Sequence, residues 1–354
     1  MPDTIPKKVL FTGGGTLGPV SPLLALVPEL RDQGVEVEFV GTPDGPERQP
    51  VEQAGLKFYT LQAPRLRRFW SVHNLGIPFS LIRGLGQASR LLGQINPQVI
   101  VSAGGFVSVP LVWMGRLRGI PAIIHQQDLR PGLANRLMQH QAKVITVAFE
   151  SSKIDFPKSK RVEWIGNPVR DLTPSTHSLH LDQQFPTVLI FGGGTGAQAL
   201  NALVGKSLCE QANVIHLTGA GKKGPNFQHP RYHQFEFLGE DMKEALAVAD
   251  VVVSRAGLGT ISELAALKKV ALIIPLPSSH QEDNASWLEA HDAAVVFEQS
   301  KLDPDRLTRN VTRLLTDQPL RTKLSKNISK ITRPDAAHRL VEIILEQTQR
   351  RGVS

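Results

Sequence analysis

The sequence predicts an α/β protein with two doubly wound domains, each a parallel sheet with helices on both faces. Short apolar runs rich in Val and Ile recur between helix-length segments, and they are continuous, not alternating. Continuous runs are typical of strands buried on both faces, as in parallel sheets. The runs form two series of five, namely 9–11, 37–40, 99–101, 122–124 and 144–147, then 188–191, 214–217, 251–253, 271–274 and 293–297.

Chain length and an internal repeat both indicate two domains. The 354 residues exceed one ordinary domain of about 150 residues. Residues 9–16 read VLFTGGGT and residues 188–195 read VLIFGGGT, and helical patterns follow at 22–30 and 197–208. We therefore expect an N-terminal domain over 1–170, a second over 171–334 that opens with a polar stretch, and an amphipathic helix in 335–354 that packs back on one of the domains.

Composition restricts the class of protein and its compartment. The formal charge of +8 suits a phosphate-bearing ligand, an anionic lipid or nucleic acid, although solubility alone is an alternative. The single cysteine, Cys209, excludes an internal disulfide framework and falls in a helical pattern, so we expect a buried structural thiol. We expect neither a signal peptide nor a membrane-spanning helix, and a protein kept in the cytoplasm.

Both glycine turns formally satisfy a dinucleotide-binding fingerprint, which is a weak signal by itself. A nicotinamide enzyme also needs an acid at the end of the second strand, to hold the ribose. The corresponding strands here end in Val40-Gly41-Thr42 and Leu217-Thr218-Gly219, without an acid. A dehydrogenase is therefore disfavoured. A turn followed by a helix start still suits a phosphate, and a purely structural turn is the alternative.

Five further motifs occur in order along the chain. They are GGFVS at 104–108, HQQD at 125–128, GNPVR at 166–170, SRAG with TISE within 254–263, and PLPSSHQEDNA at 275–285. Together with the glycine turns, over nearly the whole chain, this set resembles the MurG family. These transferases add N-acetylglucosamine to the undecaprenyl-linked muramyl-pentapeptide precursor of peptidoglycan. The resemblance implies a GT-B fold of two Rossmann-like domains with an interdomain cleft, and an inverting reaction without metal or cofactor.

The resemblance places the UDP-sugar donor mainly on the second domain. Glu263 would hold the ribose hydroxyls, since a carboxylate can accept two hydrogen bonds from a diol; the alternative is a capping box with Thr260. His280 would contact the donor, or it is a plain loop histidine. Arg255 would neutralise the charge of the diphosphate, or it is a solvated surface arginine. Arg170 would reach a phosphate, or it fixes the turn between the domains. The expected donor residues are Gly193, Gly194, Gly196, Asn201, Arg255, Glu263, His280, Gln281, Asn284 and Arg170.

The first domain is expected to bind the lipid-linked acceptor and its diphosphate. The residues implied are Gly14, Gly15, Thr16, Gly18, Gly105, Phe106, His125, Gln126 and Asp128. The family's first loop usually carries a histidine where this chain has Pro19, and proline has no group that accepts a proton. Asp128 becomes our candidate base, with Thr16 as a second catalytic candidate and helix capping as the alternative for Asp128.

The absence of this histidine leaves three interpretations open: a base that has moved, a different lipid-linked acceptor, or a homologue that binds without catalysis. A UDP-sugar epimerase of the same two-domain build is a further rival. We expect UDP-N-acetylglucosamine and the undecaprenyl-linked muramyl peptide as partners, cell-wall synthesis proteins as further candidates, and no nucleic acid.

A basic and apolar segment between the second and third apolar runs is expected to dock on the membrane. Five arginines and no acids lie within 65–90, interleaved with aromatic and aliphatic residues, which suits the lipid headgroup layer. A structural helix is the alternative, and no recognition motif or stacking platform supports nucleic acid. We predict a peripheral protein on the cytoplasmic side of the cell membrane, with an anionic surface contacted by Arg67, Arg68, Trp70, Phe79, Ile82 and Arg83.

Overall fold

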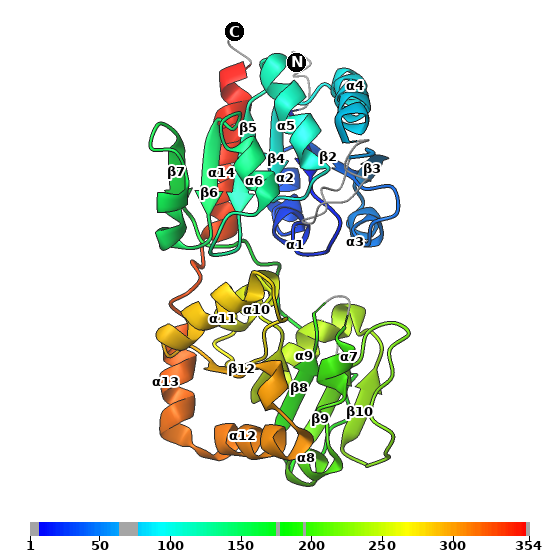
Figure 1. The fold of residues 1–354 in the computed structure, drawn as a ribbon, viewed down its shortest axis with the longest axis vertical. Helices are drawn as coiled ribbons and strands as arrows, with labels where there is room; N and C mark the ends of the chain where they lie inside the picture. Colours follow the sequence, from blue (N-terminus) through cyan, green and yellow to red (C-terminus); the bar gives the residue numbers. More distant parts are fainter. Residues whose placement is uncertain (1–6, 64–76, 175–177, 194–195, 352–354) are drawn as a thin grey trace. The chain divides into compact units, whose positions relative to one another are not determined.

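The computed structural model describes residues 7–63, 77–174, 178–193 and 196–351, without the side chains of 77–81 and 350–351. The chain divides into two compact units. Unit 1 comprises Met1–Arg170 and Arg333–Ser354, and unit 2 comprises Asp171–Thr332 (Figure 1).

Unit 1 is built on a parallel sheet with the strand order β3-β2-β1-β4-β5-β6-β7. Its strands are β1 (Lys7–Thr12), β2 (Val35–Gly41), β3 (Lys57–Thr60), β4 (Val99–Ser102), β5 (Ala122–Gln126), β6 (Val144–Val147) and β7 (Arg161–Trp164). The central strands are fully buried because helices cover both faces of the sheet.

Unit 2 repeats this plan with the order β10-β9-β8-β11-β12-β13, again parallel throughout. The strands are β8 (Thr187–Phe191), β9 (Asn213–Leu217), β10 (Tyr232–Phe235), β11 (Val251–Ser254), β12 (Val270–Ile273) and β13 (Val295–Val296). The predicted fold class of two doubly wound parallel sheets is therefore confirmed.

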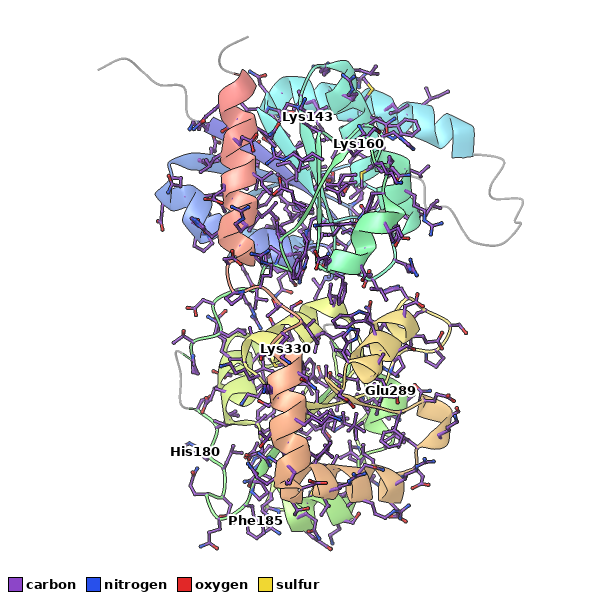
Figure 2. All side chains as sticks on the ribbon, turned by 90° about the vertical axis from the view of Figure 1, so that its left-hand side faces the viewer. Lys143, Lys160, His180, Phe185, Glu289 and Lys330 are labelled. Carbon is purple, nitrogen blue, oxygen red and sulfur yellow. The ribbon has the colours of Figure 1, made fainter. Side chains whose placement is uncertain are left out.

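All ten apolar runs form strands, and three further strands were not predicted because they contain no such run. These are β3, β7 and β10, which read KFYT, RVEW and YHQF and lie at sheet edges, where their residues are only partly buried. An edge strand pairs on one side only and needs no continuous apolar run. At one edge, Lys160 donates to the carbonyls of His140 (2.6 Å) and Ala142 (3.0 Å) just before β7 begins; Figure 2 labels it.

Two groups of helices enclose the sheet of unit 1. One apolar cluster joins β1 and β2 to the C-terminal helix, through Leu340, Ile343 and Ile344, and another covers the opposite face. Figure 1 shows the C-terminal helix lying along this unit. The helices are α1 (Ser21–Leu24), α2 (Val27–Asp32), α3 (Arg48–Gln53), α4 (Ile77–Ile95), α5 (Ser108–Leu117), α6 (Leu133–Met138) and α14 (Ala336–Arg351), with a 3-10 turn η2 (Glu150–Asp155).

Unit 2 has a core of its own around β8, β11 and β12, and it encloses Cys209. Cys209 is fully buried, as expected of a structural cysteine, and this burial raises the pKa of its thiol to about 11. The helical elements are α7 (Gln198–Asn201), α8 (Lys206–Gln211), η3 (Gly239–Asp241), α9 (Met242–Val248), α10 (Leu258–Ala266), α11 (Gln281–Ala290), η4 (Gln299–Lys301), α12 (Pro304–Thr316) and α13 (Gln318–Ile328).

The helices expected after the two glycine turns are each broken in two. The first splits between Leu24 and Val27, because Pro28 has no N–H to donate to the Leu24 carbonyl. The second splits before Gly205, which caps α8 in an extended conformation. These helices are consequently short, and the turns before them depend on tertiary contacts for their shape.

Candidate active site

The strand orders locate the place where each unit is expected to bind a ligand. From β1 the chain proceeds outward through β2 and β3, whereas β4 to β7 lie on the other side, so the order reverses between β1 and β4. Unit 2 has the same reversal between β8 and β11. In open α/β sheets, ligands bind beyond the carboxyl ends of the strands at this point. The predicted glycine turns follow β1 and β8 directly.

In unit 1, the loops after β1 and β4 lie in direct contact. Gly105 has φ +92°, and a Cβ placed on it would lie 2.8 Å from both the nitrogen and the oxygen of Gly14. Only glycine permits this close approach of two backbones. Gly14, Gly15 and Phe106 are partly buried, while Thr16 and Gly18 are exposed. The structure therefore brings the expected glycine residues of the acceptor side together.

The loop after β5 joins the same site and carries Asp128. Gln126, which is buried, donates through Nε2 to the carbonyls of Asp128 (2.7 Å) and Arg130 (3.0 Å). Gln127 donates to the Ala103 carbonyl (3.2 Å) and thereby ties this loop to the one after β4. The capping alternative for Asp128 is wrong, since α6 begins at Leu133 with Gly132 as its N-cap.

His125 lies beneath this loop and has no exposed surface. Because Oδ1 of Asn167 carries no hydrogen, His125 donates to it through Nε2 (3.0 Å) and accepts from the Thr146 hydroxyl at Nδ1 (2.9 Å). Burial lowers the pKa of His125 to about 4. His125 and Gln126 were expected to bind the acceptor, and the structure instead buries both: Gln126 holds the loop after β5, while His125 bonds to β6 and to the segment after β7.

In unit 2, the turn after β8 packs against the end of β9. A Cβ on Gly196, whose φ is +68°, would lie 2.3 Å from the Thr218 carbonyl oxygen, whereas a Cβ on Gly193, at φ +83°, would meet nothing within 4 Å. Gly194 lies outside the described residues. Lys222 donates through Nζ to the Gly196 carbonyl (2.8 Å) and was missed in the sequence. The GAGKK run at 219–223, two lysines next to glycines directly after an apolar run, could have indicated a basic residue near this turn.

Asn201, an expected donor residue, is buried behind this turn. Its Nδ2 donates to the carbonyls of Thr218 (3.1 Å) and Lys223 (3.3 Å), and its Oδ1 accepts from Nε2 of His216 (3.1 Å). His216 is fully buried on β9, and its pKa is lowered to about 4 by burial. Each unit thus contains a neutral, buried histidine paired with an asparagine.

The helix after β11 presents its N-terminus at the switch point. Gly257 is the N-cap of α10, so the first-turn amides follow it directly and can receive a phosphate. The capping-box alternative for Glu263 is wrong, because Thr260 lies inside the helix and not at its cap. Glu263 is partly buried on the second turn of α10.

Arg255 and Asn284 are buried, with exposed fractions of 5% and 0%. The Arg255 guanidinium donates to the carbonyls of Ile274 (3.1 Å) and Pro275 (3.0 Å) and to Gln299 (2.6 Å), and burial lowers its pKa. Asn284 donates to the Ala256 carbonyl (3.1 Å). The solvated-arginine alternative is therefore wrong, and both side chains hold the loops that surround the switch point.

The loop between β12 and α11 is the outer part of the donor side. His280 is exposed and is the N-cap residue of α11, without a side-chain capping bond. Gln281 accepts from the Leu276 amide (3.0 Å) and so shapes the loop itself. Arg170 is partly buried at the end of the first segment of unit 1.

Part of the expected membrane surface lies on α4. Ile82 is 68% exposed and the adjacent Arg83 is exposed, while Ala88, Leu92 and Ile95 face the core. Arg67, Arg68 and Trp70 lie outside the described residues, as does the side chain of Phe79. Within the described ranges, no helix is long and apolar enough to cross a membrane.

The two buried histidines make the fold sensitive to acid. Well above pH 6.5 both are neutral in the folded and unfolded chains, and their contribution to stability is fully present. Between pH 6.5 and 4 both imidazoles bind a proton in the unfolded chain but stay neutral in the folded chain. The free energy of unfolding therefore falls by up to about 3 kcal/mol per histidine. Thermal unfolding at pH 7 and pH 4.5 measures this, and His216→Gln is expected to reduce the loss. Equal losses in His216→Gln and the unmodified protein would contradict the prediction.

Two family models match the chain, one in each half. Residues 9–147 match the glycosyltransferase family 28 N-terminal domain, and residues 187–340 match the glycosyltransferase family 28 C-terminal domain. The chain therefore belongs to glycosyltransferase family 28.

Individual relatives indicate which kind of family 28 glycosyltransferase this chain resembles. A Lachnospira eligens protein named UDP-N-acetylglucosamine--N-acetylmuramyl-(pentapeptide) pyrophosphoryl-undecaprenol N-acetylglucosamine transferase is 36% identical, over 97% of this chain and 100% of that protein. A protein of the same name from Lachnoclostridium phytofermentans is 35% identical, over 96% and 99%. The crystal structure of Acinetobacter baumannii MurG is 28% identical with a TM-score of 0.74, over 96% of this chain and 100% of that one. The resemblance to the MurG family and the GT-B fold class are thereby confirmed.

Proposed function

We propose that this protein transfers N-acetylglucosamine from UDP-N-acetylglucosamine to undecaprenyl-pyrophosphoryl-N-acetylmuramyl-pentapeptide, with inversion at the anomeric carbon. The observation that carries the proposal is the full-length similarity to transferases of that name, with identities of 35–36%. It is supported by a glycine turn at the switch point of each parallel sheet.

The donor is assigned to unit 2. The first-turn amides of α10 and the turn after β8 receive the diphosphate, and Lys222 adds positive charge beside that turn. Negative charge grows on the diphosphate as UDP leaves, so these groups stabilise the transition state more than the ground state. Glu263 accepts hydrogen bonds from the ribose, while His280 and Gln281 line the sugar side. Asn201, Arg255 and Asn284 support these loops from below.

The acceptor is assigned to unit 1, over the loops after β1, β4 and β5. Inversion is a single displacement, so one base removes the proton of the acceptor hydroxyl as its oxygen attacks the anomeric carbon. Pro19 cannot serve as that base, and Asp128 is the titratable group held on these loops by Gln126 and Gln127. We assign the base to Asp128.

The test is incubation with labelled UDP-N-acetylglucosamine and the lipid-linked muramyl acceptor. Transfer of label to the lipid is the expected result. Release of free sugar without transfer, conversion to another UDP-sugar, or UDP binding without turnover would each overturn the proposal.

We further propose that α4 docks the protein on the anionic inner face of the cell membrane. Ile82 and Arg83 are adjacent and exposed, and each basic group near an anionic surface adds about 1 kcal/mol. Co-sedimentation with anionic vesicles is expected, and Arg83→Gln should weaken it about fivefold, the equivalent of about 1 kcal/mol. Arg309→Gln, an exposed arginine of unit 2, is the matched control and should not weaken it. Equal partition into neutral vesicles would contradict the proposal.

A further inference from the structure

A buried carboxylate lies inside the first glycine turn. Glu47, the N-cap residue of α3, is 0% exposed. Its Oε2 accepts from the Gly15 amide (3.2 Å), and its Oε1 accepts from the amide (2.7 Å) and hydroxyl (2.5 Å) of Thr42, which follows β2. The carboxylate therefore links the turn after β1 to the end of the neighbouring strand.

Glycines surround this carboxylate for a spatial reason. A Cβ on Gly14 would lie 2.2 Å from Oε1, and a Cβ on Gly45 would lie 2.0 Å from both Oε2 and the Thr42 hydroxyl oxygen. A Cβ on Gly41 would meet the Phe58 ring first, at 2.6 Å. None of these three glycines has a positive φ. Their backbone conformations would accept other residues, so the space occupied by Glu47 and its partner Thr42 is what requires glycine at positions 14 and 45, whereas the Phe58 ring requires it at position 41.

The chemistry of the three partners requires a carboxylate. All of them are donors, and they approach both oxygens. A glutamine would present its NH₂ group to one side, and the two bonds from Thr42 would hold its oxygen on theirs. Gly15 would then face a donor with its own N–H, and the turn would move away.

We infer that Glu47 is the positioning residue of the acceptor side: it fixes the first glycine turn from below and occupies the Gly15 amide. This inference rests on the proposed function for its kinetic consequence. The expectation that Gly15 receives the acceptor diphosphate is corrected, because its N–H already binds Glu47. The acceptor is met instead by the exposed residues Thr16 and Gly18.

The two turns therefore differ in charge, although their sequences repeat. A carboxylate lies within the turn of unit 1, whereas the ammonium of Lys222 reaches the turn of unit 2. Electrostatics favours a diphosphate at the second turn and disfavours one close to the first. The duplicated motif has separated into a donor-phosphate turn and an acceptor-positioning turn.

Two variants act on the link between Glu47 and Gly15 by different routes. Glu47→Gln removes the acceptor opposite Gly15, while Gly45→Ala displaces both Oε2 and the Thr42 hydroxyl without removing any hydrogen-bonding group. Thr42→Val is the matched control, because it removes one bond to the same carboxylate but spares the Gly15 bond. If Glu47→Gln fails to fold, Gly45→Ala still tests the inference.

Hydrogen–deuterium exchange of residues 13–18 reports on the turn without any need for activity. We expect faster exchange in Glu47→Gln and Gly45→Ala than in Thr42→Val. Steady-state kinetics should show kcat/KM for the lipid acceptor lowered about tenfold to a hundredfold in the first two variants, with an unchanged KM for UDP-N-acetylglucosamine.

Lowered thermal stability with exchange and acceptor kcat/KM equal to those of Thr42→Val would overturn the inference, since it would show a merely structural role. An unmodified protein that transfers no sugar to the lipid would refute the proposed function and with it the kinetic consequence. The exchange comparison would then decide by itself whether Glu47 fixes the turn.

Discussion

Asp128→Asn is expected to lower kcat by about 10²–10⁴-fold, the usual contribution of a general base, while UDP affinity stays unchanged. The carboxylate lies two residues beyond β5 on a loop tied to its neighbours by Gln126 and Gln127. Asparagine keeps the size and the backbone contacts but cannot take the proton of the attacking hydroxyl. Steady-state kinetics and UDP titration calorimetry measure the two effects separately.

Asp44→Asn is the matched control for this experiment. Asp44 is exposed on unit 1, in the loop after β2, and the same chemical change there should leave kcat unaltered. Turnover retained in Asp128→Asn would remove Asp128 from the role of base. A parallel loss of turnover and UDP affinity would indicate a general disturbance of the fold.

Gly196→Ala is expected to destabilise unit 2 by about 4 kcal/mol and to abolish the thermal shift caused by UDP. Alanine at a positive φ costs about 1–2 kcal/mol, and overpacking against rigid neighbours adds about 1–3 kcal/mol. The neighbours here are backbone atoms, namely the Thr218 oxygen at 2.3 Å and the Gly219 Cα at 2.6 Å, which cannot rotate away. Urea unfolding measures the loss of stability.

Gly193→Ala separates the cost of the backbone conformation from the cost of the collision. Gly193 also has a positive φ, but its added Cβ would meet nothing within 4 Å, so we expect a loss of only about 1–2 kcal/mol. A similar loss of unfolding free energy at both positions would show that the contact between residue 196 and the backbone after β9 adds no cost.

The functional consequence of these predictions is a division of labour between the two units. In the proposed mechanism, unit 1 orients the acceptor hydroxyl and removes its proton, and unit 2 stabilises the departing diphosphate. The first task needs a base on fixed loops, and the second needs amides and positive charge. The presence of Glu47 in one turn and Lys222 beside the other agrees with that division.

The two-sheet fold and the family could be predicted from the sequence because their signals are local. Strands buried on both faces need continuous apolar residues, and backbone turns that approach another chain segment closely need glycine. Both requirements act within a few neighbouring residues. The edge strands β3, β7 and β10 escaped prediction because one side of each is unpaired and the burial pattern is broken.

The position of each polar side chain was decided only by the tertiary structure. His125, Asn201, Arg255 and Asn284 belong to motifs expected to touch ligands, yet all are buried and hydrogen-bonded to other parts of their own unit. Nothing in the motifs distinguishes a residue that touches a ligand from one that supports it.

Glu47 and Lys222 were missed for the same reason. Glu47 lies 32 residues from Gly15, and Lys222 lies 26 residues from Gly196. The sequence by itself determined the strands with continuous apolar runs, the glycine turns and the family. Which side chain fills each turn, and with which charge, depends on the strands and loops that the sheet brings together, because a buried polar group must find its partner among whatever groups surround it in space.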